Sequence, residues 1–289
     1  MSKVIIIGSG PAGISAALYT ARAGIETMVI TKGQGSLNKA ESIENYYGFS
    51  EAVSGKELEE RGIEGAKKLG VKFISAEVTG LSFFDNFIVE TNSGNYKADS
   101  VIIATGAARN TPRIKGLADF EERGVSYCAV CDAFAYRGAD VAVLGNGAYA
   151  AHEISGLLDV VKSVTLLTDG NEIAVDIPSV VNIINKKIAK VGGEERLSFV
   201  EFDDGSKLEI SGIFIAVGTA GSTELAKKIG AYTENNKIYV NEKATTTVPG
   251  LFAAGDCTGG LMQVAKAVYE GAVAGLEAVK FLREKKNKK

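Results

Sequence analysis

The chain has 289 residues, of which 46% are hydrophobic, so it can bury the core of one large domain or of two medium ones. Its formal net charge of -3 comes from 32 basic and 35 acidic residues mixed along the chain, which argues against binding to nucleic acid. The start, MSKVIIIGSG, is too short in apolar residues for a signal segment, and no stretch approaches the roughly 18 apolar residues of a membrane span. We therefore expect a cytoplasmic protein.

The first predicted elements are a strand, a glycine turn and a helix. An apolar, β-branched run covers 4–7, and a helical pattern covers 11–23. Between them Gly8, Gly10 and Gly13 let a backbone approach a pyrophosphate, which the helix N-terminus can bind through free N–H groups. This start predicts a dinucleotide site. The acid that usually binds the adenosine ribose is missing, because the second strand, 26–30, is followed by Thr31 and Lys32.

A helix at 54–69 and a strand at 101–104 come next, and residues 128–132 then read CAVCD. The chain has only three cysteines, too few for a disulfide scaffold, and a C-x-x-C pair in a reducing compartment is usually catalytic or metal-binding. A zinc site would need every cysteine and the single histidine, His152. We therefore expect a redox pair and no metal, with Cys257 as a small buried residue.

The strand, turn and helix pattern then returns. A strand at 141–144 precedes Gly145, Gly147 and Ala150, and a helical stretch covers 148–159. Strands at 163–167 and 211–217 follow. The second of these strands leads to Gly218, as the strand at 101–104 leads to Gly106. The chain from Gly145 to Gly218 is shorter than the chain from Gly8 to Gly106. The pattern indicates an internal duplication whose second copy is the shorter one.

A last strand, 251–254, leads into a strongly helical C-terminal segment that belongs to neither copy by order. A return of the chain to the first domain explains this best. The alternation of strands and helices predicts an α/β protein with two Rossmann-like dinucleotide-binding domains, the second inserted into the first. The expected segments are 1–111, 112–243 and 244–289.

The order of the motifs resembles the low-molecular-weight thioredoxin reductases over the whole chain. The matching features are GSGPAG at the start, ATGA at 104–107, GVSYCAVCDAFAYRG at 124–138, the second glycine turn and AAGD at 253–256. The resemblance implies a homodimer that binds FAD and reduces thioredoxin. It also implies that the FAD-binding residues are Gly8, Gly10, Pro11, Ala12, Gly13, Asn45, Ala104, Thr105, Gly106, Gly255, Asp256 and Gln263. The family's arginine beside that glutamine is Met262 here.

The same resemblance implies the roles of the dithiol residues. Cys131 is the thiol that meets the flavin, and Cys128 is the outer thiol that attacks the partner's disulfide. Asp132 gives or takes the proton.

The chain departs from the family where the electron donor should bind. The family's usual NADPH site has a His-Arg-Arg-x-x-x-Arg run, but this chain has no arginine there, and its acids Asp169, Glu172 and Asp176 would repel a 2′-phosphate. NADH stays open, because Asp169 follows Gly147 at close to the spacing of a ribose-binding acid. Against NADH, we expect the bulky Tyr149 to crowd the turn.

The missing basic run and the compact second copy resemble more closely the ferredoxin-dependent flavin thioredoxin reductases. This resemblance implies reduced ferredoxin as the electron donor. A ferredoxin needs positive surface, for which the expected residues are Lys186, Lys187, Lys190, Lys266, Lys280 and Arg283. The alternatives are an NADH- or NADPH-dependent thioredoxin reductase and a non-enzymatic flavin-binding sensor whose dithiol only reports the redox state.

Overall fold

A computed structural model describes residues 3–33, 35–106, 112–121, 123–127, 129–218 and 220–287, without the side chains of residues 130 and 131. The chain forms two compact units. Unit 1 comprises Met1–Arg109 and Gly221–Lys289, and unit 2 comprises Asn110–Ala220. Among the described residues, no helix is both long and apolar enough to cross a membrane.

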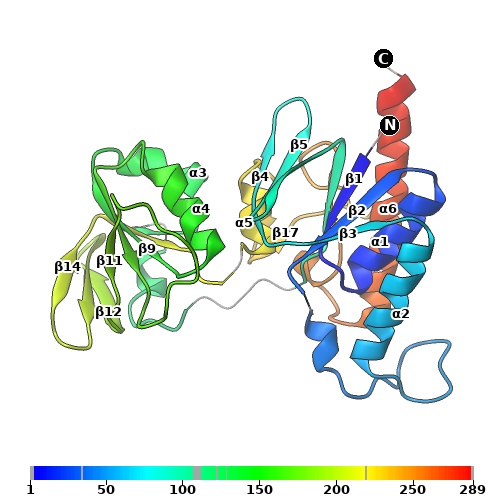
Figure 1. Ribbon diagram of the computed structural model, residues 1–289, viewed down its shortest axis with the longest axis horizontal. Coiled ribbons are helices and arrows are strands. Elements are labelled where there is room, and N and C mark those ends of the chain that lie inside the picture. Colours follow the sequence, from blue (N-terminus) through cyan, green and yellow to red (C-terminus); the bar gives the residue numbers. More distant parts are fainter. Residues whose placement is uncertain are drawn as a thin grey trace. The chain divides into compact units, whose positions relative to one another are not determined.

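The centre of unit 1 is a parallel sheet of five strands, drawn in Figure 1. Its strands, in spatial order, are β18 (Leu251–Ala253), β7 (Ser100–Ile103), β1 (Lys3–Ile7), β2 (Glu26–Thr31) and β3 (Lys72–Ser75). The register pairs Ile6 with Val29 on one side and with Ile102 on the other. The apolar runs read from the sequence therefore become adjacent buried strands, as expected of a parallel sheet.

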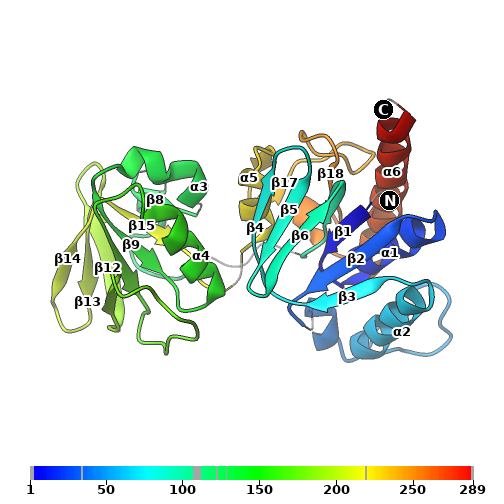
Figure 2. The ribbon, with the colours of Figure 1, turned by 45° about the horizontal axis from the view of Figure 1, so that its top comes forward.

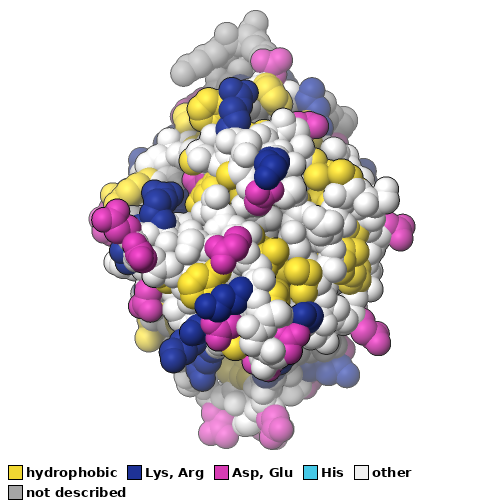
Figure 3. Space-filling model, turned by 90° about the vertical axis from the view of Figure 1, so that its left-hand side faces the viewer, with side chains coloured by type: hydrophobic (Ala, Val, Ile, Leu, Met, Phe, Trp, Pro, Cys, Tyr) yellow, Lys and Arg dark blue, Asp and Glu magenta, His cyan; other side chains and the backbone are white. Residues whose placement is uncertain are grey.

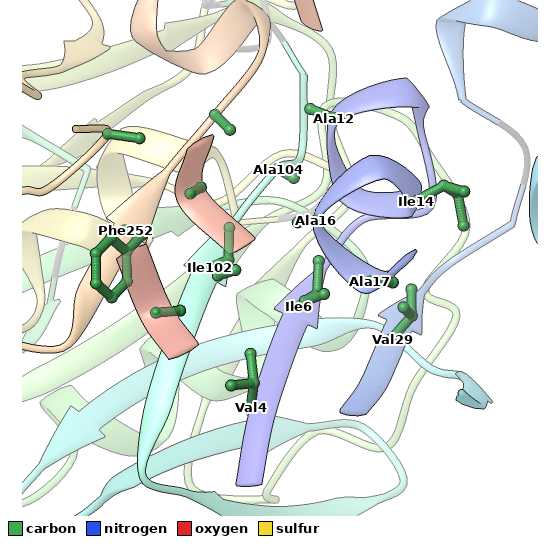
Figure 4. Packing of buried hydrophobic residues seen from close by; sticks show 14 of the residues in the cluster. Val4, Ile6, Ala12, Ile14, Ala16, Ala17, Val29, Ile102, Ala104 and Phe252 are labelled. Atoms are coloured by element: carbon green, nitrogen blue, oxygen red, sulfur yellow. The ribbon is translucent and has the colours of Figure 1, made fainter. Parts of the chain in front are cut away.

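Three helices cover one face of this sheet: α1 (Pro11–Arg22), α2 (Gly55–Lys68) and α6 (Val264–Asn287). Figure 4 shows Val4, Ile6, Val29 and Ile102 on the face of the sheet that α1 covers, with Phe252 farther along beside α6, where its ring packs on Phe281. The backbones of α1 and α6 come very close, since a Cβ added at Gly271 would lie 2.1 Å from the Ala12 carbonyl oxygen. This packing carries the C-terminal helix back onto the first strand-turn-helix motif.

Unit 1 also contains an antiparallel sheet and several short elements, shown in Figure 2. The sheet consists of β4 (Val78–Phe83), β5 (Phe87–Thr91) and β6 (Gly94–Ala98). The short elements are η1 (Ser36–Lys39), α5 (Ser222–Lys227), β16 (Thr233–Glu234), β17 (Lys237–Ile238) and η4 (Asp256–Thr258).

Unit 2 is built on a second parallel sheet. Its strands, in spatial order, are β11 (Asn182–Ile184), β10 (Ser163–Leu167), β9 (Asp140–Leu144), β15 (Gly212–Ile215) and β8 (Val125–Ser126). An antiparallel sheet of β12 (Ile188–Gly193), β13 (Leu197–Phe202) and β14 (Lys207–Glu209) packs against it in one apolar core. The helical elements are η2 (Ala118–Phe120), α3 (Ala129–Asp132), η3 (Ala133–Tyr136) and α4 (Ala148–Leu157).

The two units repeat one architecture. In each unit the strand before the glycine turn is the central one. An antiparallel three-stranded sheet follows the edge strand β3 or β11 in the chain and precedes β7 or β15, the strand that pairs with the central one. The connection from β2 to β3 runs over 32–71 and includes α2, whereas the connection from β10 to β11 runs only over 168–181 and has no such helix. This missing helix accounts for the shorter second copy. The predicted fold class is confirmed.

The second domain boundary was predicted too late in the chain. We expected the return to the first domain near Lys243, but unit 1 resumes at Gly221. The physical reason is the docking of α5 and the β16–β17 hairpin on unit 1, where Lys228 donates a hydrogen bond to the Thr79 carbonyl at 3.1 Å. The first expected boundary lies between residues 111 and 112, and residues 107–111 lie outside the described part of the chain.

Candidate functional site

Three of the predicted segments meet at one edge of the unit 1 sheet. β1, β7 and β18 are neighbours, and their carboxyl ends lead into residues 8–13, 104–106 and 254–256. A Cβ at Gly8, which has φ +110°, would lie 2.3 Å from the Ala104 carbonyl oxygen. Gly255 is also close to α1, since its added Cβ would lie 3.0 Å from the Ala12 Cβ. Ligands of open α/β sheets bind at such an edge.

The glycine turn has the form of a pyrophosphate site. Gly10 is the N-cap of α1 and Pro11 occupies its first turn, and no side chain caps the helix. A Cβ at Gly10 would meet nothing within 4 Å, whereas one at Gly13 would lie 2.0 Å from the Gly8 carbonyl oxygen. The turn is thus tight internally and open toward the helix N-terminus, where free N–H groups attract an anion.

The two residues expected beside a flavin ring come together. Asn45 and Gln263, 218 positions apart, are joined by a hydrogen bond from Asn45 Nδ2 to Gln263 Oε1 at 3.2 Å, and both are exposed. Asp256 lies in η4 with a half-buried side chain, and its carboxylate accepts no hydrogen bond from any described residue. Amide and carboxylate groups of this kind are available to a ligand. Thr105 is exposed and Gly106 is half-buried at the same edge.

Cys257 is buried, as expected, with 0% exposure. Its sulfur lies 3.3 Å from the Ala254 carbonyl oxygen, and burial raises the pKa of its thiol to about 12. A thiol of this pKa stays protonated and takes no part in thiolate chemistry.

The structure adds an acid that sequence reasoning missed. Ser9, within the glycine turn, lies 3.0 Å from the Thr31 hydroxyl and donates to Glu59 Oε1 of α2 at 3.4 Å. Glu59 is 6% exposed, and burial raises the pKa of its carboxyl group. A carboxylate therefore stands beside the end of β2, where the sequence itself has Thr31. Glu59 lies 50 positions from Ser9 in the chain, so no local sequence motif linked it to the glycine turn.

The dithiol segment begins beside the end of β8. Cys128 lies outside the described residues, while Cys131 and Asp132 belong to α3. Asp132 is exposed, and its Oδ2 accepts a hydrogen bond from the buried Ser126 hydroxyl at 2.7 Å. The expected proton-transfer group is thus fixed by a neighbour that the sequence did not single out.

The second glycine turn repeats the first in its backbone. A Cβ at Gly145 would lie 2.4 Å from the Ala216 carbonyl oxygen, as one at Gly8 would lie close to that of Ala104. However, the loop after β10 is bonded to the turn. Asn146 donates from Nδ2 to the Glu172 carbonyl at 2.8 Å, and the Ala174 N–H donates to the Asn146 carbonyl at 2.9 Å.

The acid expected to bind an NADH ribose is already engaged. Asp169 Oδ1 accepts the Ile188 N–H at 2.8 Å, and Oδ2 lies 3.4 Å from Lys187 Nζ. Asp169 also adopts a left-handed backbone, with φ +50°. Its carboxylate therefore fixes the start of β12 and faces an existing cation.

Tyr149 does not crowd the turn in the way we expected. It is 2% exposed, and its hydroxyl donates to the Tyr127 carbonyl at 3.0 Å. The ring is therefore part of the core of unit 2, and a Cβ at Gly147 would meet nothing within 4 Å. The features that argue against a nucleotide here are the hydrogen bonds between Asn146 and the loop after β10, and the existing partners of Asp169.

Most of the lysines expected to attract ferredoxin are paired with acids. Lys186 lies 2.7 Å from Asp204, Lys187 pairs with Asp169, and Lys190 lies 3.3 Å from Glu201. Lys266 is only 15% exposed in its side chain and pairs with Glu270. The face drawn in Figure 3 mixes cationic and acidic side chains. Surface pairs of this kind leave little net positive charge.

The fold and the glycine turns define a protein of the Rossmann-like dinucleotide-binding class, and comparisons with known proteins identify its family. The model of the pyridine nucleotide-disulphide oxidoreductase family matches residues 2–271. The thioredoxin reductase of Aquifex aeolicus is 34% identical over 98% of this chain and 94% of its own length. The chain therefore belongs to this family, among the low-molecular-weight thioredoxin reductases, which are flavoproteins that bind FAD.

Two solved structures are particularly similar. The atypical thioredoxin reductase TRi from Desulfovibrio vulgaris Hildenborough is 39% identical, with a TM-score of 0.92 over 98% of this chain and 99% of that chain. A ferredoxin-flavin thioredoxin reductase from Clostridium acetobutylicum is 31% identical, with a TM-score of 0.71 over 98% of this chain and 100% of that chain.

Proposed function

We propose that this thioredoxin reductase takes its electrons from reduced ferredoxin rather than from NADH or NADPH. The observation that carries the proposal is the set of hydrogen bonds between the second glycine turn and the loop after β10. A ribose held by an acid after the second strand has to lie between that strand end and the glycine turn. Here Asn146 binds the loop at Glu172 and Ala174, and Asp169 is engaged by Ile188 and Lys187.

The charge around this turn argues in the same direction. An NADP 2′-phosphate is bound by cations, usually arginine. Glu172 and Asp176 are acids of the same loop, and Lys187, the cation bonded to this loop, faces Asp169. The similarity to a reductase whose name includes ferredoxin supports the same donor.

In this proposal FAD binds at the edge of the unit 1 sheet. Gly10 and the first turn of α1 would hold its pyrophosphate, Asp256 would bind the ribityl side, and Asn45 and Gln263 would bind the ring side. The backbones of Pro11, Ala12, Ala104, Thr105, Gly106 and Gly255 would supply the remaining contacts. The flavin can accept electrons one at a time and deliver them as a pair.

The proposed redox balance needs two ferredoxins for each disulfide. Each ferredoxin loses one electron, and the two electrons with two protons convert the Cys128–Cys131 disulfide into two thiols. The Cys128 thiolate then attacks the thioredoxin disulfide, forming a mixed disulfide that the Cys131 thiolate cleaves to release dithiol thioredoxin. Asp132 moves the protons, held in orientation by Ser126. Such exchange requires a reducing compartment, such as the cytoplasm.

We also propose that the protein works as a homodimer. Three large side chains on α1 and α6 are exposed although they are apolar or aromatic: Tyr19 at 42%, Tyr269 at 66% and Leu276 at 53%. Tyr269 and Leu276 lie two helical turns apart on one stripe of α6, and Gly275 lies against Tyr19. An exposed apolar stripe of this kind suits a protein interface.

Anaerobic stopped flow tests the donor directly. The oxidised holoprotein is mixed with reduced ferredoxin, NADH or NADPH, and the loss of flavin absorbance is followed. We expect rapid bleaching with ferredoxin and negligible bleaching with either nicotinamide cofactor. Rapid reduction by micromolar NADH that is lost in Asp169→Ala but kept in Asp159→Ala, an exposed acid just after α4, contradicts the proposal.

Turnover separates the enzyme from a sensor. With reduced ferredoxin present, the holoprotein should reduce many equivalents of a thioredoxin disulfide. Reduction that stops once the flavin and the dithiol have each taken up two electrons, without thioredoxin turnover, indicates the non-enzymatic flavin sensor instead.

A further inference from the structure

An ion pair on α6 holds the loop of residues 255–260, which carries Asp256. Lys266 and Glu270 stand one helical turn apart, with Nζ 2.9 Å from Oε2 and side chains 15% and 23% exposed. Lys266 Nζ also donates to the Gly255 carbonyl at 2.8 Å and to the Gly259 carbonyl. A single ammonium group therefore reaches both ends of the loop.

Glu270 completes the attachment. Its Oε2 accepts the Gly255 N–H at 2.8 Å and lies 3.0 Å from the Thr258 hydroxyl. Gly255, Gly259 and Gly260 have φ of +88°, +84° and +73°, and the loop's own backbone hydrogen bonds run from the Thr258 N–H to the Gly255 carbonyl and from the Gly259 N–H to the Asp256 carbonyl. The ion pair adds side-chain partners to this single short turn. The pair supplies partners for the main chain just before and just after η4.

Lys266 has no donor left for a ligand. An ammonium group has three N–H bonds. The acceptors around Nζ are the Gly255 and Gly259 carbonyls, Glu270 Oε2 and the Thr258 hydroxyl, the last at 3.2 Å. Lys266 can therefore bind neither a phosphate nor an acidic protein without giving up the loop. What remains for this side chain is to position other groups.

We infer that Lys266 and Glu270 are positioning residues of the FAD site. They fix the loop in advance, so that Asp256, whose carboxylate has no partner among the described residues, meets the cofactor without reordering. Fixing a binding loop before binding lowers the entropic cost of binding and slows release. The inference rests on the FAD site proposed above and is independent of the electron donor.

The release of FAD from the holoprotein tests this role through the rise in flavin fluorescence. Lys266→Met leaves Glu270 without its cation and the Gly259 carbonyl without its ammonium donor, whereas the Gly255 carbonyl still accepts from Thr258. We expect release to be about tenfold faster or more. Lys266→Arg keeps the charge and should recover most of the retention. The matched controls are Lys280→Met and Glu284→Gln, which have the same spacing on the same helix but lie far from the loop in sequence, and should release FAD at the wild-type rate.

A double-variant cycle separates positioning from general loss of stability. If the pair acts through Asp256, then Asp256→Asn should accelerate release much less in the Lys266→Met background than in the wild type. Fully additive effects overturn the inference, and so does wild-type release from Lys266→Met with a native circular dichroism spectrum. If Lys266→Met does not fold, Glu270→Gln takes its place in the same cycle. The release assay contains no electron donor, so a failure of the ferredoxin proposal leaves this result unaffected.

Discussion

Two side chains of α4 hold the main chain on either side of Cys128. The Tyr149 hydroxyl bonds to the Tyr127 carbonyl, and Glu153 Oε2 accepts the Ala129 N–H at 2.5 Å. Glu153 is 1% exposed, so this carboxylate is part of the core of unit 2. Substitutions of the cysteines can therefore be interpreted against a segment whose flanking residues are fixed.

The two cysteine roles make opposite spectroscopic predictions. Cys128→Ser should leave Cys131 as a free thiolate that gives a long-wavelength charge-transfer band with the flavin, while turnover is lost. Cys131→Ser should lose turnover without this band. Absorption spectra of the two oxidised variants make the comparison, and a band found only in Cys131→Ser would reverse the roles.

The proton-transfer role of Asp132 predicts a slower exchange step. Asp132→Asn should slow dithiol-disulfide interchange with thioredoxin by about 10²-fold or more, the usual scale for a positioned acid or base. Ser126→Ala removes the hydrogen bond that orients the carboxylate and should have a smaller effect in the same direction. FAD content should be unchanged in both variants. Near-normal interchange in Asp132→Asn would mean that water or another group moves the proton.

The buried Glu59 predicts a pH-dependent stability. Burial raises the pKa of its carboxyl group in the folded state, so ionisation costs stability as the pH rises through that pKa. Glu59→Gln should therefore raise the thermal unfolding midpoint by about 2–4 °C at pH 7. The gain should disappear below the ordinary glutamate pKa of about 4.3. Glu60→Gln, on the exposed side of α2, is the control, and an equal gain at both pH values would exclude this explanation.

At the scale of elements, most parallel strands could be predicted, whereas the parallel edge strands β3, β8 and β11 and the antiparallel strands could not. Strands such as β1 and β9 are short apolar runs next to glycine turns, so their pattern is unambiguous. β6 and β12 mix exposed polar residues with glycine, as in GNYKA and IAKVGG, and resemble loops. α5 and the β16–β17 hairpin were assigned to the wrong domain because only tertiary contacts attach them to unit 1.

The exposed stripe on α6 predicts an oligomeric state that depends on one element. If Tyr19, Tyr269 and Leu276 form the homodimer interface, Tyr269→Lys should shift the protein from dimer to monomer, because it places a charge in the buried centre. Sedimentation velocity measures the change. Tyr239→Lys replaces a tyrosine that is 52% exposed but outside the stripe, and should stay dimeric. A wild-type protein that sediments as a monomer, or a dimeric Tyr269→Lys, would place the interface elsewhere or exclude it.

At the scale of the whole molecule, the site combines groups that only the folded chain brings together. The glycines of the first turn were readable because their spacing is local, whereas Asn45 and Gln263 were assigned by resemblance alone. Glu59 and the Lys266–Glu270 pair have no local motif, so no pattern in the sequence could link them to residues 8–13 or 255–260. The second glycine pattern is intact in the sequence, and only the structure reveals the hydrogen bonds that join its Asn146 to the loop after β10.

The charge distribution of the whole molecule predicts how ferredoxin association should respond to salt. The formal net charge is -3, so the protein as a whole does not attract an acidic partner, and only local cations can do so. Lys186, Lys187 and Lys190 are paired with acids, which weakens their field. We therefore expect the second-order rate of flavin reduction to fall as salt rises, but by less than about tenfold between 0.02 and 0.2 M, as screening shortens from about 20 Å to below 10 Å. Stopped flow over a salt series measures this slope. A rate that rises with salt would show that overall repulsion outweighs any local attraction, and would leave ferredoxin docking without an electrostatic basis.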